Sequence, residues 1–220
     1  MIDWKGIETV LLDMDGTLLD LHFDNYFWLE YLPSAYAAHH NISPEESNYR
    51  LQRQFAAGVG TLEWYCLDHW SDKLQMDIPA LKRTVQHRVS ARPQALAFLE
   101  DLKKMPCSVV LVTNAHRTTL DIKMEEVDIT PWFDGIVVSH DFGLPKEDPA
   151  FWHRLQKAHP FNPALTLLID DTERVLDSAR DYGIAHLLTL LQPDSSQQLR
   201  SSTRYPGIHH FDEINPLRSH

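Results

Sequence analysis

The sequence predicts an α/β fold in which a helical cap domain is inserted into a doubly wound parallel sheet. Five short apolar segments alternate with segments of helical periodicity, which is typical of a parallel sheet covered by helices on both faces. Between the first two apolar segments lies a long stretch that is rich in aromatic and charged residues and has no β-branched runs. We therefore predict a core domain formed by residues 1–20 and 91–220, and a cap domain formed by residues 21–90.

The five predicted strands are short and mostly apolar, as expected for strands buried on both faces of a sheet. Helices with one apolar face separate them, and right-handed connections between parallel strands then give a five-stranded Rossmann-like sheet. The polar, Ser-rich segment 192–207 is predicted to be a loop, and residues 211–217 are predicted to add a last turn against the core. The strands are expected at residues 10–12, 107–112, 135–139, 165–169 and 184–190.

The cap segment is predicted to contain four helices, at residues 24–40, 43–57, 61–75 and 78–90. Ser43 followed by Pro44 is a typical helix start, because Ser caps the free N–H groups and Pro suits the first helical position. Most aromatic side chains of this segment should fill the interior of the cap, while a minority faces a ligand. They include Trp28, Tyr49, Phe55, Trp64 and Trp70.

The composition excludes several classes of protein. A formal net charge of −11 argues against a general surface for nucleic acid or anionic membranes. No apolar run approaches the roughly 18 residues of a membrane span, and the N-terminus lacks the apolar segment of a signal peptide. The two cysteines are expected to be reduced thiols of a cytoplasmic protein, and the thirteen histidines show no zinc-ligand spacing. The sequence leaves the oligomeric state open.

The stretch D-M-D-G-T-L places two carboxylates, Asp13 and Asp15, at the end of the first predicted strand. Ligands of open α/β sheets bind beyond the carboxyl ends of the strands, and two adjacent acids there repel each other unless a cation or a proton stabilises them. The pattern therefore predicts a metal-assisted site in which one carboxylate attacks and another moves a proton. A calcium loop is excluded because Asp24 stands at the twelfth position, where such a loop needs Glu.

Two further predicted strands also end in polar residues. Thr113 and Asn114 follow the second strand, and Asp170 and Asp171 follow the fourth. Because the carboxyl ends of parallel strands lie at one edge of a sheet, these side chains should converge with those of the first strand.

The order of these motifs resembles the haloacid dehalogenase-like hydrolase superfamily, in its phosphatase branch with a helical cap. D-M-D-G-T-L resembles the first motif, V-L-V-T-N the second, the Lys146 segment G-L-P-K-E-D-P the third and L-L-I-D-D-T the fourth. The resemblance covers residues 7–190. Glu147 departs from the Gly-x-x-Lys-Pro pattern that is common in the family, which we expect to alter the stiffness of the loop without altering the chemistry.

The resemblance implies a role for each motif residue. Asp13 would be the nucleophile and form an aspartyl-phosphate, and Asp15 would protonate the leaving oxygen and then activate water. Lys146 would neutralise developing charge, and Thr113 would hold the phosphoryl oxygens. Substrate binding is thus assigned to Asp15, Gly16, Thr113, Asn114 and Lys146. A Mg²⁺ cofactor is assigned to Asp13, Asp15, Asp170 and Asp171, whose oxygen ligands suit magnesium better than zinc.

The first-motif context, which continues L-D-L-H-F-D-N-Y-F-W into the cap, resembles the bacterial GMP/IMP nucleotidases of this superfamily. The resemblance implies a small-molecule phosphomonoester substrate, a purine nucleoside monophosphate. His22, Phe23 and Tyr26 follow the first motif, where a leaving group could contact them, but Phe23 and Tyr26 would equally serve to seal the junction between core and cap. Arg50 and Arg53 could meet the base, although we expect them on a solvated face.

Other functions remain open at this point. The same core chemistry would serve a sugar-phosphate phosphatase or a phosphomutase, and a non-catalytic binding protein could share the fold. Asp15 speaks against a dehalogenase, because dehalogenases of the superfamily lack this acid. Phosphonate hydrolysis requires a cap lysine that forms a Schiff base, and we expect the cap lysines Lys73 and Lys82 to lie at the surface instead.

Overall fold

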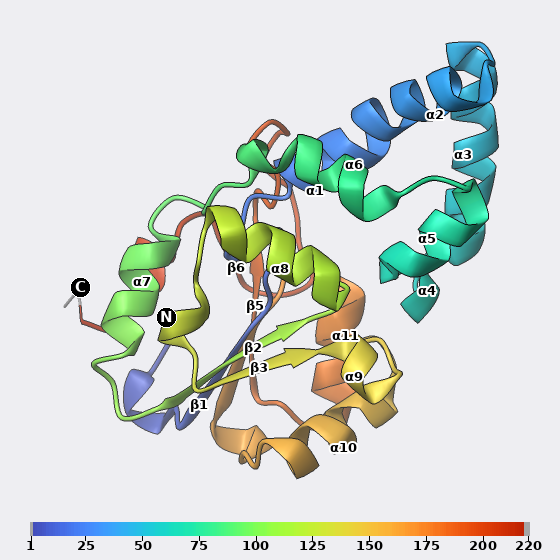
Figure 1. Ribbon diagram of the computed structural model, residues 1–220. Helices are drawn as coiled ribbons and strands as arrows, with labels where there is room; N and C mark the ends of the chain where they lie inside the picture. Colours follow the sequence, from blue (N-terminus) through green and yellow to red (C-terminus); the bar gives the residue numbers. More distant parts are fainter. Residues whose placement is uncertain (1, 218–220) are drawn as a thin grey trace.

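The central sheet has six parallel strands in the order β3-β2-β1-β4-β5-β6, with β1 (Thr9–Leu12) in its interior (Figure 1). A computed structural model describes residues 2–217 of the chain. The α/β parallel architecture predicted from the sequence is confirmed. The other strands are β2 (Ser108–Thr113), β3 (Gly135–Val138), β4 (Thr166–Ile169), β5 (His186–Leu190) and β6 (Gly207–Ile208).

The prediction of five strands is wrong by one, because β6 falls at the end of the segment predicted to be a loop. It pairs Gly207 with Thr189 and Ile208 with Leu190 at the edge of the sheet. A strand of two residues has no alternation that a sequence pattern could reveal.

The side chains of β1 alternate between two apolar layers. Val10 and Leu12 belong to one cluster, which also contains residues of α7 and α8, whereas Leu11 belongs to the other, which contains residues of α10 and α11. Helices therefore cover both faces of the sheet, as a parallel sheet requires. The core helices are α7 (Ala95–Leu102), α8 (Arg117–Glu126), α9 (Ser139–Phe142), α10 (Pro149–Ala158) and α11 (Glu173–Tyr182). Short 3-10 turns lie at Trp4–Gly6, Thr130–Trp132, Pro163–Leu165 and Phe211–Ile214.

The helices between β1 and α7 project from the core as a separate lobe (Figure 1). Its first helix is continuous from His22 to His40 but contains a π-helical turn. Ser43 caps α3 as predicted, since its hydroxyl accepts a hydrogen bond of 3.2 Å from the N–H of Glu46. The elements are α1 (His22–Tyr26), the π turn (Phe27–Tyr31), α2 (Leu32–His40), α3 (Pro44–Gly58), α4 (Leu62–Tyr65), α5 (Leu67–Leu74), α6 (Ile78–Thr84) and a 3-10 turn (Gln86–Arg88).

The four predicted cap helices are thus not four unbroken helices. The predicted helix 61–75 is divided at Cys66, whose backbone is extended and whose Sγ accepts a hydrogen bond of 3.5 Å from the N–H of His69 at the start of α5. The predicted helix 78–90 ends at Thr84 and is followed by a 3-10 turn.

Four aromatic rings pack edge to face inside the cap, with centroids 5.2 to 5.9 Å apart. We call Trp28, Phe55, Trp64 and Trp70 the aromatic cluster. Tyr49, predicted to be in the cap interior, is instead 57% exposed and lies beside Arg53 on the outer face of α3.

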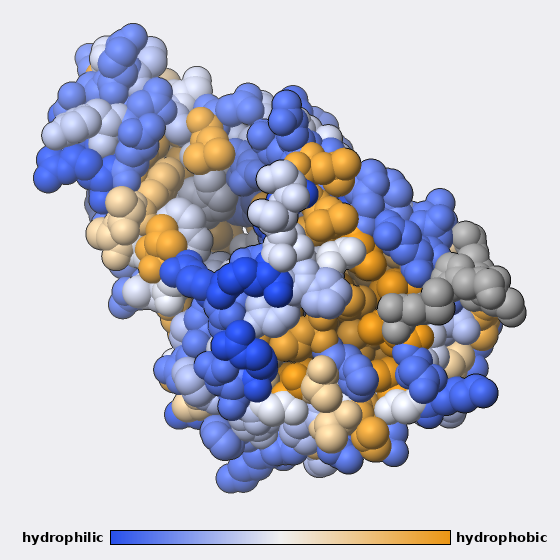
Figure 2. All heavy atoms as spheres, turned by 180° about the vertical axis from the view of Figure 1, so that it is seen from behind, coloured by the Kyte–Doolittle hydropathy of each residue, from blue (hydrophilic) through white to orange (hydrophobic). Residues whose placement is uncertain are grey.

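The space-filling surface is hollowed between the cap and the core (Figure 2). No helix within residues 2–217 is long and apolar enough to span a lipid bilayer.

Candidate active site

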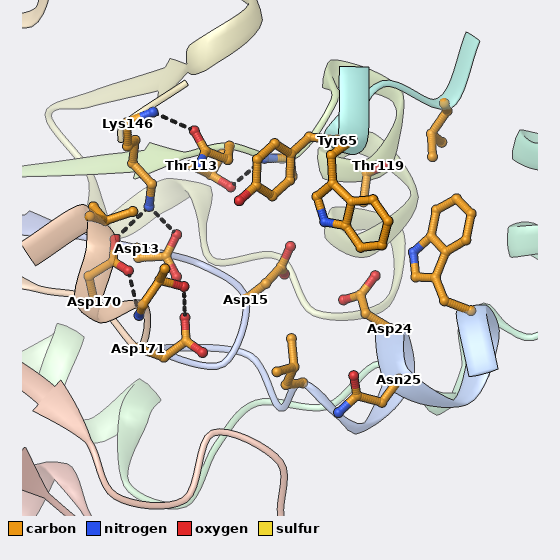
Figure 3. A pocket seen from close by; sticks show the side chains of 18 of the residues that line it. Asp13, Asp15, Asp24, Asn25, Tyr65, Thr113, Thr119, Lys146, Asp170 and Asp171 are labelled. Carbon is orange, nitrogen blue, oxygen red and sulfur yellow. Dashed lines mark hydrogen bonds and ion pairs between the residues drawn. The ribbon is translucent and has the colours of Figure 1, made fainter. Parts of the chain in front are cut away.

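The ends of three neighbouring strands form the floor of one cavity. Asp13 follows β1, Thr113 ends β2, and Asp170 and Asp171 follow β4, and both β2 and β4 are bonded to β1. The cavity has a volume of about 290 Å³ and reaches from these strand ends to the cap (Figure 3). The convergence expected from the sequence is therefore present in the structure.

Lys146 lies at the centre of the strand ends. Its Nζ is 2.6 Å from Asp13 Oδ1, 2.7 Å from Asp170 Oδ2 and 3.0 Å from the carbonyl oxygen of Val112. Burial would lower the pKa of this lysine, but the charges of Asp13 and Asp170 outweigh burial and raise it. Lys146 is consequently a permanent positive charge that fixes two carboxylates in place.

Three carboxylates, those of Asp13, Asp170 and Asp171, lie at the strand ends, and the single positive charge of Lys146 cannot neutralise all of them. Burial, reinforced by neighbouring carboxylates, raises the pKa of Asp13 and of Asp171 to about 7 and that of Asp170 to about 6. One oxygen of each of these three acids lies within 4.8 Å of the others. Oxygen donors that are held together against their mutual repulsion fit a hard divalent cation such as Mg²⁺.

The two adjacent aspartates after β4 are engaged differently. Asp170 accepts from Lys146 with one oxygen and from the N–H of Thr172, at 2.9 Å, with the other. Within residues 2–217, the Asp171 carboxylate accepts one hydrogen bond, of 3.2 Å from the hydroxyl of Thr172, and its Oδ2 lies 3.7 Å from the guanidinium of Arg200. Asp171 is therefore the better placed of the two to offer an oxygen to a ligand. Arg200 was not predicted, because it stands in a polar segment with no motif.

The side chains of Thr113 and Asn114, the two residues predicted at the end of the second strand, accept hydrogen bonds that hold the loop after β2. Thr113 Oγ1 accepts a 3.0 Å bond from the N–H of Ala115, and Asn114 Oδ1 accepts a 2.9 Å bond from the N–H of Lys146. Asn114 Nδ2 donates to Glu147, whose other oxygen accepts a 2.9 Å bond from the hydroxyl of Tyr65 in the cap. Glu147, the departure from the family pattern, thus connects the core to the cap.

Gly16, predicted to bind substrate, is not among the residues that line the cavity. Its N–H donates a 2.8 Å bond to the carbonyl of Leu19, and its φ of +78° favours glycine. A Cβ at this position would meet Asp171 Cγ at 2.8 Å, so that the residue allows a close approach of two loops. Beside it, the buried Thr17 donates a 3.1 Å bond to Asp13 Oδ2.

Asp15 belongs to a partly buried ion-pair network that the sequence did not reveal. Lys123 of α8 donates to Asp15 Oδ1 at 2.5 Å and also to Asp24 Oδ2, and Lys82 of α6 donates to Asp24 Oδ1 at 2.7 Å. We call Asp15, Lys123, Asp24 and Lys82 the acid–lysine network. Burial favours a higher pKa for Asp24, but the two lysines outweigh it and lower that pKa to about 2.

The predicted surface position of Lys82 is wrong, since its side chain is 1% exposed. Its ammonium lies 5.0 Å from the ring centroid of Phe23, and Lys123 lies 5.3 Å from the same ring. A signal was available: Lys82 follows the buried Ile78 by four residues, and Lys123 follows the buried Leu120 by three. Both lysines thus stand on the apolar stripe of their helix.

His22, Phe23 and Tyr26 do not line the cavity, so of the two interpretations of Phe23 and Tyr26 the structure favours a seal between core and cap. Phe23 is buried beneath the two lysines, Tyr26 packs under the guanidinium of Arg88, and His22 lies 3.7 Å from Asp194. The cap end of the cavity is lined instead by Leu21, Asn25, Trp28, Trp64, Tyr65 and Leu67. The prediction for the arginines is correct, because Arg50 pairs with Glu46 on the exposed face of α3.

The haloacid dehalogenase-like hydrolase family matches residues 7–183 of the chain. The chain is 39% identical over 215 residues to the GMP/IMP nucleotidase YrfG of Escherichia coli (strain K12) and to that of Shigella flexneri, and the match covers 98% of this chain and 97% of each relative. A solved HAD phosphatase from Thermococcus onnurineus superposes with a TM-score of 0.78 at 16% identity, covering 94% of this chain and 96% of that one. At that identity, the likeness shows a shared fold alone.

Proposed function

Because the chain belongs to the haloacid dehalogenase-like hydrolase family, we propose that it is a magnesium-dependent phosphomonoesterase that acts on purine nucleoside 5′-monophosphates, above all GMP and IMP. One observation carries the proposal: a single cavity has Asp13 and Lys146 at one end and indole rings at the other. Such a cavity suits a substrate with a phosphoryl group and a planar apolar group. The 39% identity to GMP/IMP nucleotidases supports the choice of purines.

In the proposed mechanism Asp13 attacks the phosphorus atom through a carboxylate oxygen, and the bond from phosphorus to the ester oxygen breaks. Lys146 and Thr17 hold the attacking carboxylate by its two oxygens, so that little reorientation is needed before attack. Asp15 gives its proton to the departing ester oxygen. It then takes a proton from the water that attacks the aspartyl-phosphate, which releases phosphate and regenerates Asp13.

Charge neutralisation around the phosphoryl group falls to Lys146 and to the loop after β2, where Thr113 and Asn114 lie. We propose that Mg²⁺ binds the carboxylates of Asp13 and Asp171 and the backbone carbonyl of Asp15, with Asp170 as a further or nearby ligand. When bound, the cation supplies positive charge that offsets the repulsion between the acids and the substrate phosphate.

The cap end supports a nucleotide rather than a small sugar phosphate. Trp28 and Trp64 line this end and are held by edge-to-face contacts with Phe55 and Trp70. Indole rings fixed in this way offer a preformed apolar wall on which a purine can stack. A sugar phosphate has no group that would use this wall.

The proposal is tested by phosphate release from a panel of substrates at equal enzyme concentration with Mg²⁺. The panel contains GMP, IMP, AMP, CMP, ribose 5-phosphate and p-nitrophenyl phosphate. We expect kcat/KM for GMP and IMP to exceed that for ribose 5-phosphate and CMP by about tenfold or more, the effect of about one stacking contact.

Two outcomes would contradict the proposal at different levels. A sugar phosphate that is hydrolysed faster than the purine nucleotides would overturn the substrate and favour a sugar-phosphate phosphatase with the same core chemistry. Full activity in the presence of a strong chelator would overturn the role of the cation.

A further inference from the structure

The acid–lysine network lies midway along the cavity, between the phosphate end and the aromatic cluster. Figure 3 shows the carboxylates of Asp15 and Asp24 side by side there, with Lys146 and Asp13 toward one end and Asn25 below Asp24. Asp15 has a role in the proposed mechanism, whereas Asp24 has none, although it lines the same cavity.

The two acids of the network face the cavity more than the two lysines do. The side chains of Lys82 and Lys123 are each 1% exposed, whereas those of Asp24 and Asp15 are 15% and 23% exposed. Lys123 does not line the cavity, and Lys82 lines it with little exposed surface, so the carboxylates are the more accessible polar groups here. At this depth, the groups that the cavity presents to a ligand are mainly hydrogen-bond acceptors. The part of the substrate that lies here should therefore carry hydrogen-bond donors.

Lys123 also limits the distance between the two acids. Because one ammonium donates to both carboxylates, the bonded oxygens of Asp15 and Asp24 lie within about 6 Å of each other, the length of two hydrogen bonds. Asp15 must meet the ester oxygen that leaves. The group next to Asp24 is thus one that lies a few bonds from that oxygen.

In a nucleoside 5′-monophosphate, the groups that satisfy both conditions are the hydroxyls of the ribose. They are donors, and they lie between the ester oxygen and the base. We propose that Asp24 binds the ribose hydroxyls of the substrate and so makes the enzyme select ribonucleotides over deoxyribonucleotides. This inference rests on the proposed nucleotidase function and names the sugar that the site recognises.

The chemistry of Asp24 suits this task. A carboxylate forms stronger hydrogen bonds with hydroxyl groups than a neutral acceptor does, and acidic side chains bind ribose hydroxyls in dinucleotide sites for the same reason. Lys82 and Lys123 bond one oxygen each, and every carboxylate oxygen has a second lone pair for a ligand. The lysines thus hold the carboxylate in one orientation without using all of its capacity.

The test compares kcat/KM within substrate pairs that differ by one hydroxyl group. GMP is compared with 2′-deoxy-GMP and 3′-deoxy-GMP, and ribose 5-phosphate with 2-deoxyribose 5-phosphate. For the wild type we expect the loss of a bound hydroxyl to lower kcat/KM by about tenfold or more, as for one hydrogen bond to a charged group. In Asp24→Asn the ratio should fall to within about threefold of one, because a neutral amide forms a weaker bond.

Lys82→Met is the matched control, because it disrupts the same network but keeps Asp24 and its bond to Lys123. It should change both members of each pair equally and leave their ratio intact. The charge-balanced double variant Asp24→Asn/Lys82→Met replaces the single variant if a lone buried lysine prevents folding, and melting temperatures are compared throughout. The kcat/KM ratios of the wild-type enzyme test the proposal even if no variant folds.

A wild-type ratio near one for every pair, or an unchanged ratio in Asp24→Asn, would overturn the assignment of Asp24 to the ribose. Failure of the proposed function is a separate result: ribose 5-phosphate would then be a better substrate than GMP. In that case the two sugar phosphates alone decide whether Asp24 binds a hydroxyl group.

Discussion

The two ends of the cavity are built in different ways. At the phosphate end, the acids and Lys146 come from the sheet edge and the loops beside it, and each occupies a place fixed by a neighbouring strand. At the cap end, Trp28, Trp64 and Lys82 come from three separate helices that meet only in the folded cap. The phosphate end is therefore specified by local motifs, whereas the cap end, which we propose to select the leaving group, is specified by tertiary packing.

The largest effect should come from the phosphate end. Asp13→Asn preserves the shape of the proposed nucleophile but replaces the carboxylate with an amide, which is a poor nucleophile and a poor metal ligand. We expect kcat to fall by about a thousandfold or more for every substrate, at roughly 4 kcal/mol of transition-state free energy. Phosphate release and circular dichroism measure activity and fold.

The exposed Asp181→Asn serves as the matched control for this substitution. Retention of even about a tenth of wild-type activity in Asp13→Asn would show that another group is the nucleophile.

The next largest effect should distinguish Asp171 from its neighbour Asp170 at the phosphate end, through the affinity for Mg²⁺. Asp171→Ala should raise the Mg²⁺ concentration for half-maximal activity by about a hundredfold, and Asp170→Ala by less, because the ammonium of Lys146 already neutralises Asp170, whereas the nearest cation to Asp171 is Arg200 at 3.7 Å. Titration of Mg²⁺ into chelator-treated protein measures both values, and calcium should inhibit because it favours more ligands and looser geometry. Equal, mild effects at the two positions would refute this ranking.

A cap substitution should act on one class of substrate only. Trp28→Leu removes part of the aromatic wall and should raise KM for GMP by about tenfold, while KM for ribose 5-phosphate changes by less than about twofold. Steady-state kinetics with both substrates give the two values. Trp132→Leu, outside the cavity, is the control. A parallel change for both substrates would mean that Trp28 supports the fold of the cap rather than the base.

The smallest effect concerns stability and pH. The pKa of Asp24 is lowered to about 2, so its ionised form stabilises the fold above pH 4, and this contribution is lost as the pH falls toward 2. Asp24→Asn should therefore cost about 2 kcal/mol of unfolding free energy at pH 6, and the deficit should shrink as the pH falls below 4. Urea denaturation of both proteins from pH 6 to pH 3 measures the difference. A deficit that does not change with pH would contradict the ion-pair account.

Much of the core was predictable because its signals are local. A short apolar run that ends in an acid identifies both a buried strand and the place where its last side chain emerges, as at Leu12 and Asp13. The edge strand β6 was not predictable, since two residues carry no periodicity. Nor was the break at Cys66, because a thiol that caps a helix gives no pattern distinct from an interior residue.

The cap end of the site escaped prediction for a related reason. Proximity along the chain left open whether Phe23 and Tyr26 face the leaving group or seal the junction between core and cap. Helical rotation turns them away from the cavity and brings Trp28 to it. Lys123 lies 108 residues from its partner Asp15. A charge in a helix usually indicates a solvated face, so only its position on the apolar stripe distinguished this lysine.

The aromatic cluster has one more consequence. Two of the six tryptophans of the chain, Trp28 and Trp64, line the cavity, and their rings pack against Phe55 and Trp70. Indole emission responds to an aromatic partner stacked against the ring. Occupancy of the cavity should therefore be measurable by intrinsic fluorescence, without a label, in the Asp13→Asn variant, which we expect to bind substrate without hydrolysing it. The residues that would recognise the base also serve as the optical probe of its arrival.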